Sequence, residues 1–271
     1  MYAIARPGGA GVFRDGRRTP AGAHGPRWPT LRVVAHRPVA INLLLLSNSR
    51  MPDGRYLAHA LDAIAETAAG RRRALFLPFA GTTIPWDDYA ANVREALAPL
   101  GLEIATAHRA DDPAAALAAA ELVLVGGGNT FRLLHESRRR GWLGPIRDAA
   151  AGGMPYVGWS AGSVLAGPTI RTTNDMPIVD PGGLESLALV PFQLNCHYTD
   201  AMPPGHQGET RRQRLAEYLV LSPRDTVIGL PEGDWLAVRD GAVALHGPHD
   251  AWLFRAGRDA AALAPGPLAL G

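Results

Sequence analysis

The sequence of 271 residues contains a single cysteine, Cys196, and no lysine, so all 27 basic side chains are arginines. One cysteine excludes an intrachain disulfide and is typical of proteins from a reducing compartment. We attribute the absence of lysine, together with the abundance of Ala, Gly and Pro, to coding bias. It has one chemical consequence, because a site that binds a carboxylate must then use arginine or protonated histidine.

Long apolar runs are also lacking. No stretch approaches the roughly 20 consecutive apolar residues that a membrane-spanning helix needs. Residues 1–40 have no apolar core of the kind found in secretory signal peptides. We therefore expect a cytoplasmic protein with no membrane partner.

Charge is distributed unevenly along the chain. The whole sequence has a net charge of +2, but residues 1–40 hold seven arginines and one acid, which leaves residues 41–271 with 20 arginines and 24 acids, a net −4. The basic balance therefore comes from the terminal segment, and we expect no nucleic-acid partner. Because residues 1–40 are rich in Gly and Pro without apolar periodicity, we expect a disordered N-terminal extension there and a single domain over residues 41–271.

From residue 41 onward, short apolar runs alternate with segments of helical periodicity. Four largely apolar runs are predicted as strands of a buried sheet: residues 41–46, 74–79, 121–125 and 155–158. Such alternation indicates βαβ units, so the expected fold class is α/β, with a mainly parallel sheet sandwiched by helices. Beyond Ser160 the order loosens, and we expect mixed edge strands and a hairpin over residues 242–254.

Residues 158–162 read Gly-Trp-Ser-Ala-Gly directly after a predicted strand. In this G-x-S-x-G pattern a sharp strand-to-helix turn lifts the serine hydroxyl clear of the sheet, and the small residues on either side let the backbone pass closely. The pattern makes Ser160 a candidate nucleophile. Gly-rich turns also produce it by chance, so a purely structural turn is the alternative.

A second glycine-rich turn, residues 126–129, follows another predicted strand. Because the carboxyl ends of neighbouring strands line one crevice in a doubly wound sheet, this turn is expected beside Ser160. We expect the N–H groups of Gly128 and Ala161 to form an oxyanion hole. The alternative is a tight turn alone, and a phosphate-binding loop is disfavoured because the Lys-Ser/Thr of the P-loop is absent.

A serine nucleophile needs a base, and the base needs an acid that orients it. Among the nine histidines, His197 ends an apolar run, where its side chain would face the same crevice. Asp175 and Glu232, both in polar loops at strand ends, are the candidates for the orienting acid, and spacing alone does not choose between them. A structural role for His197 is the alternative.

Two other chemistries have weaker support. Cys196 lies next to His197, but no turn motif presents its sulfur, and a free cysteine is most often a small core residue. The sequence has neither an H-E-x-x-H motif nor a cluster of Cys and His at metal-ligand spacing. We therefore expect no metal and no cofactor.

The segment 209–214 opens a predicted helix with three arginines, which the helix dipole disfavours. Either an anionic substrate group binds at this end of the helix, or the arginines form a solvated face. The sequence leaves both interpretations open.

Together these motifs resemble peptidase E, a family of serine peptidases that act on aspartyl dipeptides. The resemblance runs from residue 42 to beyond residue 254 and rests on ordered, unusual segments: residues 43–49, 78–81, 86–89, 125–131, 158–162, 169–180, 208–211 and 228–233. Residues 1–40 have no counterpart in the family pattern. Cys196 is a departure, since it stands where the family has a proline before the histidine.

The resemblance implies a cytoplasmic, metal-independent enzyme that hydrolyses dipeptides with an N-terminal aspartate. It implies Ser160 as nucleophile, His197 as general base and Asp175 as charge-relay acid, with Glu232 as a second candidate for that acid. The implied fold is related to class I glutamine amidotransferases, with a serine instead of a cysteine in the nucleophile elbow.

An aspartate side chain is best recognised by arginine, because a guanidinium pairs with both carboxylate oxygens. We expect Arg211 to bind it, with Arg171 as the second candidate. The expected partner is a small peptide substrate, and a homodimer is compatible with the sequence. Two alternative functions stand: a cyanophycinase-like hydrolase of β-aspartyl peptides, and a non-catalytic small-molecule binding protein on the same scaffold.

Overall fold

A computed structural model describes residues 41–205 and 207–270 of the chain. The extension predicted for residues 1–40 lies outside the described residues. Within the described ranges, no helix is long and apolar enough to cross a membrane.

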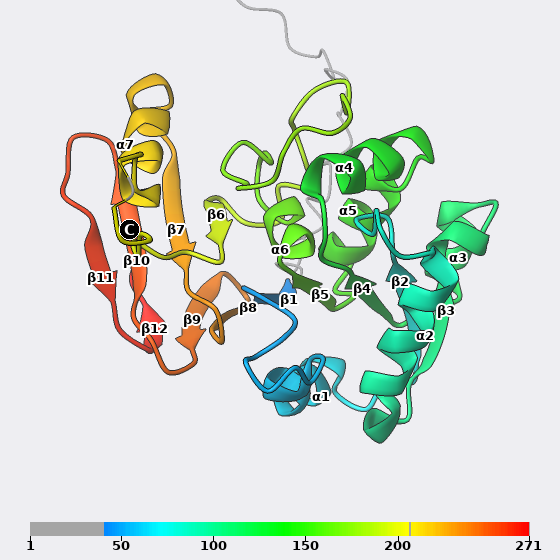
Figure 1. Ribbon diagram of the computed structural model, residues 1–271. Coiled ribbons are helices and arrows are strands. Elements are labelled where there is room, and N and C mark those ends of the chain that lie inside the picture. Colours follow the sequence, from blue (N-terminus) through cyan, green and yellow to red (C-terminus); the bar gives the residue numbers. More distant parts are fainter. Residues whose placement is uncertain (1–40, 206, 271) are drawn as a thin grey trace, which may run out of the picture. The chain divides into compact units, whose positions relative to one another are not determined.

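Among the described residues, the larger of two sheets has eight strands, in the order β12-β9-β8-β1-β5-β4-β2-β3 (Figure 1). Five of them run parallel at its centre and one edge: β1 (Asn42–Leu46), β2 (Arg73–Leu77), β3 (Glu103–Thr106), β4 (Leu122–Val125) and β5 (Tyr156–Trp159). Three more continue the sheet antiparallel beyond β1: β8 (Trp235–Arg239), β9 (Ala242–His246) and β12 (Gly266–Leu268).

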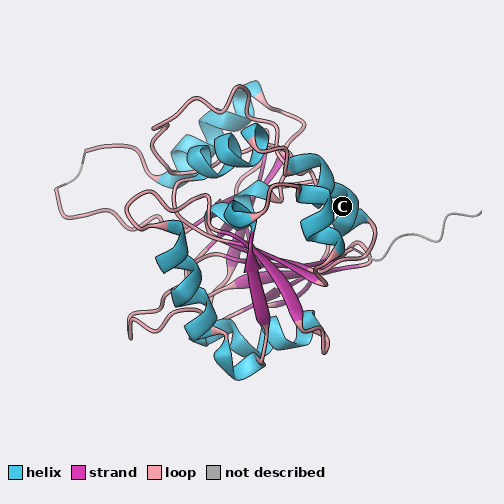
Figure 2. Cartoon of the chain, turned by 90° about the vertical axis from the view of Figure 1, so that its right-hand side faces the viewer, coloured by secondary structure: helices cyan, strands magenta, loops and turns pink. Residues whose placement is uncertain are grey.

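Helices cover both faces of this sheet, as Figure 2 shows. In β1, Leu43 and Leu45 belong to the core on one face, whereas Leu44 and Leu46 belong to the core on the other, because successive side chains of a strand point to opposite sides. The first core is closed by α3 (Pro113–Ala118), α4 (Thr130–Arg139), α5 (Leu143–Ala151) and α6 (Ala161–Leu165). The second is closed by α1 (Leu61–Ala68) and α2 (Trp86–Ala96). Short 3₁₀ helices complete the connections: η1 (Ala58–Ala60), η2 (Ala98–Leu100) and η3 (Ala107–Arg109). The predicted α/β sandwich with a mainly parallel sheet is confirmed.

The smaller sheet has four strands in the order β11-β10-β7-β6. It consists of β6 (Gln193–Cys196), β7 (Thr226–Leu230), β10 (Ala251–Arg255) and β11 (Ala261–Leu263), with β6 and β7 parallel. Helix α7 (Arg211–Leu221) packs against it through Leu215 and Leu219, which join Tyr198, Val227 and Phe254 in a separate apolar cluster. This second sheet was not expected from the sequence.

The hairpin predicted over residues 242–254 is wrong, because its two strands belong to different sheets. Strand β9 pairs with β8 and β12, whereas β10 pairs with β7 and β11. The reason lies in the turn before β9, where Asp240 and Gly241 both have positive φ angles of 52° and 82°. A two-residue Asp-Gly turn of this kind closes a tight hairpin, which joins β9 to β8.

Candidate active site

Ser160 lies in the sharp turn between β5 and α6. Its φ and ψ angles are 52° and −114°, a strained conformation for a residue with a side chain, and such strain costs about 1–3 kcal/mol. The turn holds its shape because neighbouring backbone fills the available space. A Cβ added at Gly162 would lie 2.2 Å from the carbonyl oxygen of Val125, and one at Gly158 would lie 2.6 Å from the carbonyl carbon of Gly162. The two glycines are therefore required by the elbow.

His197 follows the last residue of β6 and reaches Ser160 from the smaller sheet. Its Nε2 lies 2.8 Å from Ser160 Oγ. Its backbone N–H donates to Ser47 Oγ at 2.9 Å, and Ser47 Oγ donates to the carbonyl of Leu230 at 2.7 Å. Ser47 directly follows β1, so this buried hydroxyl links the larger sheet to His197 after β6 and to Leu230 at the end of β7.

Glu232 occupies the turn between β7 and β8, and its Oε1 lies 2.6 Å from His197 Nδ1. A carboxylate only accepts hydrogen bonds, so the contact requires a proton on Nδ1 and leaves Nε2 free to accept the Ser160 proton. The turn is fixed by the N–H of Gly233, which donates to Asn48 Oδ1 at 2.8 Å. Ser160, His197 and Glu232 thus form a continuous hydrogen-bonded chain.

Asp175 takes a different position, at the N-terminus of α4. Its Oδ2 accepts hydrogen bonds from the backbone N–H of Thr130 at 2.7 Å, from the Thr130 hydroxyl and from Thr173 Oγ1 at 3.1 Å. Oδ1 accepts no hydrogen bond from the described residues, and Asp175 lies on the wall of the cavity that contains Ser160. Of the two acids that spacing left open, Glu232 is the one in contact with His197.

The glycine-rich turn after β4 lies against the elbow. A Cβ at Gly127 would lie 3.1 Å from the Cβ of Ser160, and the next residue, Gly128, has a φ of 133°. A Cβ at Gly128 would lie 2.4 Å from the carbonyl oxygen of Ala80, so this position excludes every other residue. The N–H groups of Gly128 and Ala161 donate to no described residue, and both remain available to a substrate oxygen.

Arg211, the expected substrate-binding residue, is half-buried in the first turn of α7. Its Nη1 donates to the carbonyl of Cys196 at 3.3 Å, immediately before His197. Burial lowers the pKa of Arg211, and the charge of Glu232 opposes this shift. The helix start is stabilised by a capping box between Thr210 and Gln213.

The second candidate, Arg171, lies near the opposite end of α7. Its Nη1 donates to Ser222 Oγ at 3.0 Å, and its guanidinium carbon lies 4.8 Å from the ring centroid of Tyr218. Ser222 is about 16 Å from Arg211 along the helix axis, at 1.5 Å per residue. Neither Arg171 nor Arg211 lines the cavity around Ser160, but Arg211 contacts the residue next to His197, whereas Arg171 does not.

The cavity at Ser160 has a volume of about 540 Å³ and also contains His197, Asp175, Gly127 and Gly128 in its lining. Sequence reasoning assigned no role to its outer wall, which comes from the loop after β1, the segment before α2 and α2 itself: Ser49, Arg50, Tyr56, Ala80, Gly81, Thr82, Thr83, Ile84, Tyr89 and Asn92. Family motifs covered Ser49, Ala80, Gly81 and Tyr89, but no local signal marks an exposed arginine such as Arg50 as part of a site.

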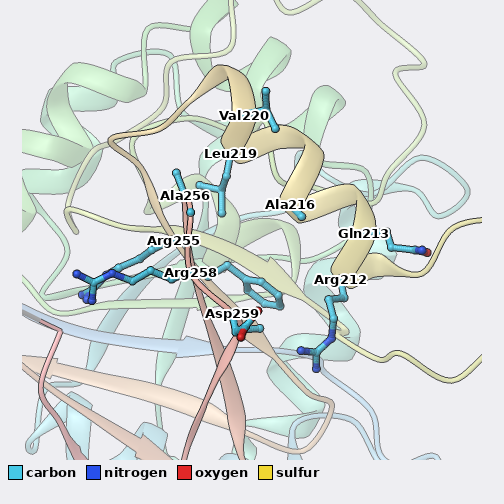
Figure 3. A pocket seen from close by; sticks show the side chains of 12 residues that line it. Arg212, Gln213, Ala216, Leu219, Val220, Arg255, Ala256, Arg258 and Asp259 are labelled. Carbon is cyan, nitrogen blue, oxygen red and sulfur yellow. The ribbon is translucent and has the colours of Figure 1, made fainter.

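A larger cavity, about 670 Å³, lies between α7 and the turn after β10 (Figure 3). Its charged residues are Arg212, Arg255, Arg258 and Asp259, and neither serine, histidine nor cysteine lines it. Arg212 is paired with Asp200 at 2.9 Å. Hydrolytic chemistry therefore belongs to the smaller cavity.

Cys196 is buried beside the elbow, and its thiol donates to the carbonyl of Ser160 at 3.6 Å. Burial, reinforced by the charge of Asp175, raises the pKa of Cys196 to about 12. The thiol therefore stays protonated and acts as a packing residue. Among the described residues, no three His, Cys, Asp or Glu side chains are grouped closely enough to hold a metal ion.

A strained serine at a strand-to-helix turn, bonded to a His–carboxylate pair and adjacent to unpaired backbone N–H groups, defines a serine hydrolase site. The sequence model of Peptidase family S51 matches residues 43–246. Proteins named Peptidase E from Salmonella heidelberg (strain SL476) and Salmonella typhimurium (strain LT2) are 55% identical over 226 residues, which cover 83% of this chain and 99% of theirs. The chain belongs to peptidase family S51 and is a serine peptidase.

Two solved structures share the fold. One is a protein from Listeria monocytogenes EGD-e assigned to peptidase E, with a TM-score of 0.58, 24% identity and coverage of 77% of this chain and 99% of that one. The other is a peptidase from an acI-B1 Actinobacterium, with a TM-score of 0.54, 16% identity and coverage of 84% and 99%.

Proposed function

We propose that this protein is a dipeptidase that hydrolyses Asp-Xaa dipeptides through an acyl-enzyme intermediate. The observation that carries the proposal is the Ser160–His197–Glu232 chain, whose Ser160 and His197 line a cavity of the size of a small peptide. The 55% identity to proteins named Peptidase E supports the same activity. The single, buried cysteine supports a cytoplasmic location.

Acylation begins when His197 Nε2 accepts the Ser160 proton and Oγ attacks the carbonyl carbon of the aspartyl residue. Glu232 holds the Nδ1–H tautomer and stabilises the imidazolium. The N–H groups of Gly128 and Ala161 donate to the oxyanion, and each contributes about 3 kcal/mol of barrier lowering. His197 then protonates the leaving amine, and the C–N bond breaks.

Deacylation repeats these steps with water. His197 takes a proton from the water, the hydroxide attacks the aspartyl ester, and the proton returns to Ser160 Oγ as free aspartate leaves. No step uses the buried thiol of Cys196.

Substrate recognition requires partners for the charges of an N-terminal aspartate. We assign its side-chain carboxylate to Arg211, which is half-buried beside His197. We assign its ammonium group to Asp175, whose Oδ1 accepts no hydrogen bond from the described residues and whose Oδ2 is fixed by Thr130. The contacts of Arg171 with Ser222 and Tyr218 argue against a direct role in binding.

The test is hydrolysis of Asp-Leu by the purified protein in the presence of EDTA, beside the variant Ser160→Ala and the control substrate Leu-Leu. Cleavage of Asp-Leu alone, absent in the variant, supports the nucleophile, the metal independence and the specificity together. If β-Asp-Arg is cleaved instead, the cyanophycinase-like alternative is correct. If a folded protein cleaves neither, the dipeptidase proposal fails and the non-catalytic alternative gains support.

We also propose that residues 41–271 form a single peptidase domain, within which the family match covers residues 43–246. A chain that starts at residue 41 should then retain the kcat/KM of the full chain on Asp-Leu. A loss of more than about tenfold would assign the N-terminal segment a part in catalysis. Gel filtration of both forms would show whether the protein is a homodimer and whether the segment contributes to it.

A further inference from the structure

Arg50 contributes an unpaired cation to the cavity around Ser160. It lies in the loop after β1, drawn in blue in Figure 1. Its Nη1 donates to the carbonyl of Gly54 at 2.5 Å, and its guanidinium carbon lies 4.9 Å from the ring centroid of Tyr56. No described acid forms an ion pair with Arg50. Its remaining N–H groups have no acceptor among the described residues and are free to bind a ligand.

The loop that carries Arg50 is fixed to the catalytic residues. Asn48 Nδ2 donates to the carbonyl of Arg50 at 2.6 Å, while Asn48 Oδ1 accepts from Gly233, next to Glu232. Arg50 and Tyr56 also form an antiparallel bridge across the loop. The backbone at Arg50 is thus held by the same asparagine that fixes the turn of the orienting acid, while the guanidinium itself is held by the Gly54 carbonyl and the Tyr56 ring.

The ring beneath the guanidinium connects to the opposite wall. Tyr56 donates to the hydroxyl of Tyr89 at 3.1 Å, and Tyr89 donates to the carbonyl of Gly127 at 3.0 Å. Gly127 precedes Gly128, whose N–H is assigned to the oxyanion. The cation is therefore positioned in advance of substrate binding, which strengthens a charged contact.

The charges in the cavity match those of a dipeptide. Among the lining residues, Arg50 and Asp175 carry the only fixed charges, and Arg211 lies outside that lining, beside Cys196. An Asp-Xaa dipeptide has an ammonium group, a side-chain carboxylate and a terminal carboxylate. The first two are assigned to Asp175 and Arg211, which leaves Arg50 for the third.

We propose that Arg50 binds the terminal carboxylate of the second residue and thereby restricts the enzyme to dipeptides. A longer peptide presents a neutral amide at that place, which cannot form the two parallel charged hydrogen bonds of a guanidinium–carboxylate pair. The inference rests on the proposed dipeptidase function.

The test compares two substrates, Asp-Leu and Asp-Leu-amide, and reads kcat/KM for each. The wild-type enzyme should prefer the free carboxylate by about tenfold to a hundredfold, the range expected for a hydrogen-bonded charged group. Arg50→Gln should reduce this preference to about twofold or less, through a higher KM for Asp-Leu, whereas Arg50→Lys should retain part of it because the charge remains.

Arg55→Gln is the matched control, since Arg55 lies in the same loop, is exposed and pairs with Asp53 at 2.7 Å. It should keep the full preference. Equal thermal unfolding midpoints for the three variants and the wild type would show that the loop change leaves the fold intact.

The outcomes separate the two proposals. If the wild type cleaves Asp-Leu but Arg50→Gln slows both substrates equally, the assignment of Arg50 is overturned and the dipeptidase function stands. A wild type without preference for the carboxylate overturns it as well. If the wild type cleaves neither substrate, the dipeptidase function fails and this inference fails with it.

Discussion

Replacing Glu232 by glutamine isolates the role of the orienting acid. The change keeps the size of the side chain and removes the charge that lies 2.6 Å from His197 Nδ1. An amide can turn its NH₂ group toward Nδ1, which favours the Nε2–H tautomer of His197. That tautomer cannot accept the Ser160 proton, so kcat should fall while substrate binding is largely preserved.

The magnitude follows from the exposure of the pair. In a buried triad, loss of the orienting carboxylate lowers kcat about 10⁴-fold, which corresponds to about 5.4 kcal/mol. Here the side chains of His197 and Glu232 are 37% and 60% exposed, so water screens the charge and solvates the imidazolium in part. We therefore expect a fall in kcat of about 10²- to 10³-fold, or about 2.7–4.1 kcal/mol.

Steady-state hydrolysis of Asp-Leu measures the effect, and Asp175→Asn is the matched variant. Asp175 lies in the same cavity but bonds Thr130 instead of His197. Its replacement should raise KM, because the ammonium group of the substrate loses its partner, and should change kcat less than Glu232→Gln does. If Asp175→Asn lowers kcat by the larger factor, the reasoning from hydrogen-bond geometry is refuted and Asp175 acts as the charge-relay acid.

Three further predictions concern the fold. Gly162→Ala should destabilise the protein by at least about 3 kcal/mol in urea unfolding, because its Cβ would meet the carbonyl of Val125. Gly144→Ala, in open space on α5, should stabilise it by about 0.5–1 kcal/mol, and equal effects of the two changes would contradict the steric argument. Burial raises the pKa of Asp234, so the contribution of this carboxyl to stability is full below about pH 4 and is lost as the pH rises through the folded-state pKa. Asp234→Asn should therefore gain in stability relative to the wild type as the pH rises from about 4 to 7, and a difference independent of pH would show that the carboxyl does not titrate as argued. Cys196 is buried with its pKa raised to about 12, so an aromatic disulfide should label no thiol in the native protein and one in urea; rapid native labelling would show that the elbow opens.

The sequence allowed prediction of the larger sheet and the elbow because both depend on local patterns. Strands β1, β4 and β5 are almost entirely apolar, as expected of strands buried on both faces. The elbow around Ser160 is likewise specified by five consecutive residues, Gly158 to Gly162, whose two glycines permit the sharp turn. By contrast, the hairpin prediction failed because strand pairing depends on turn geometry and on partners far along the chain.

The choice of orienting acid shows where local information ends. Asp175 and Glu232 both follow strand-like segments in polar loops. Glu232 contacts His197 because β6 and β7, which precede these two residues, pair in parallel in the smaller sheet. Arg50 gave no signal at all, since an arginine in a polar loop looks the same in sequence whether it faces solvent or a cavity. Its position depends on the segments before α1 and α2 folding together around Tyr56 and Tyr89.

The division of the catalytic residues between two sheets has a consequence for the order of synthesis. Ser160 is made 37 residues before His197, and His197 is made 35 residues before Glu232. A nascent chain that has completed the parallel strands already holds its nucleophile but has no base to activate it. The hydrogen bonds of the Ser47 hydroxyl also form late, because its partners His197 and Leu230 are made more than 100 residues after it. An incomplete chain therefore has no activated nucleophile. We expect peptide hydrolysis only after the chain up to Glu232 has left the ribosome and folded.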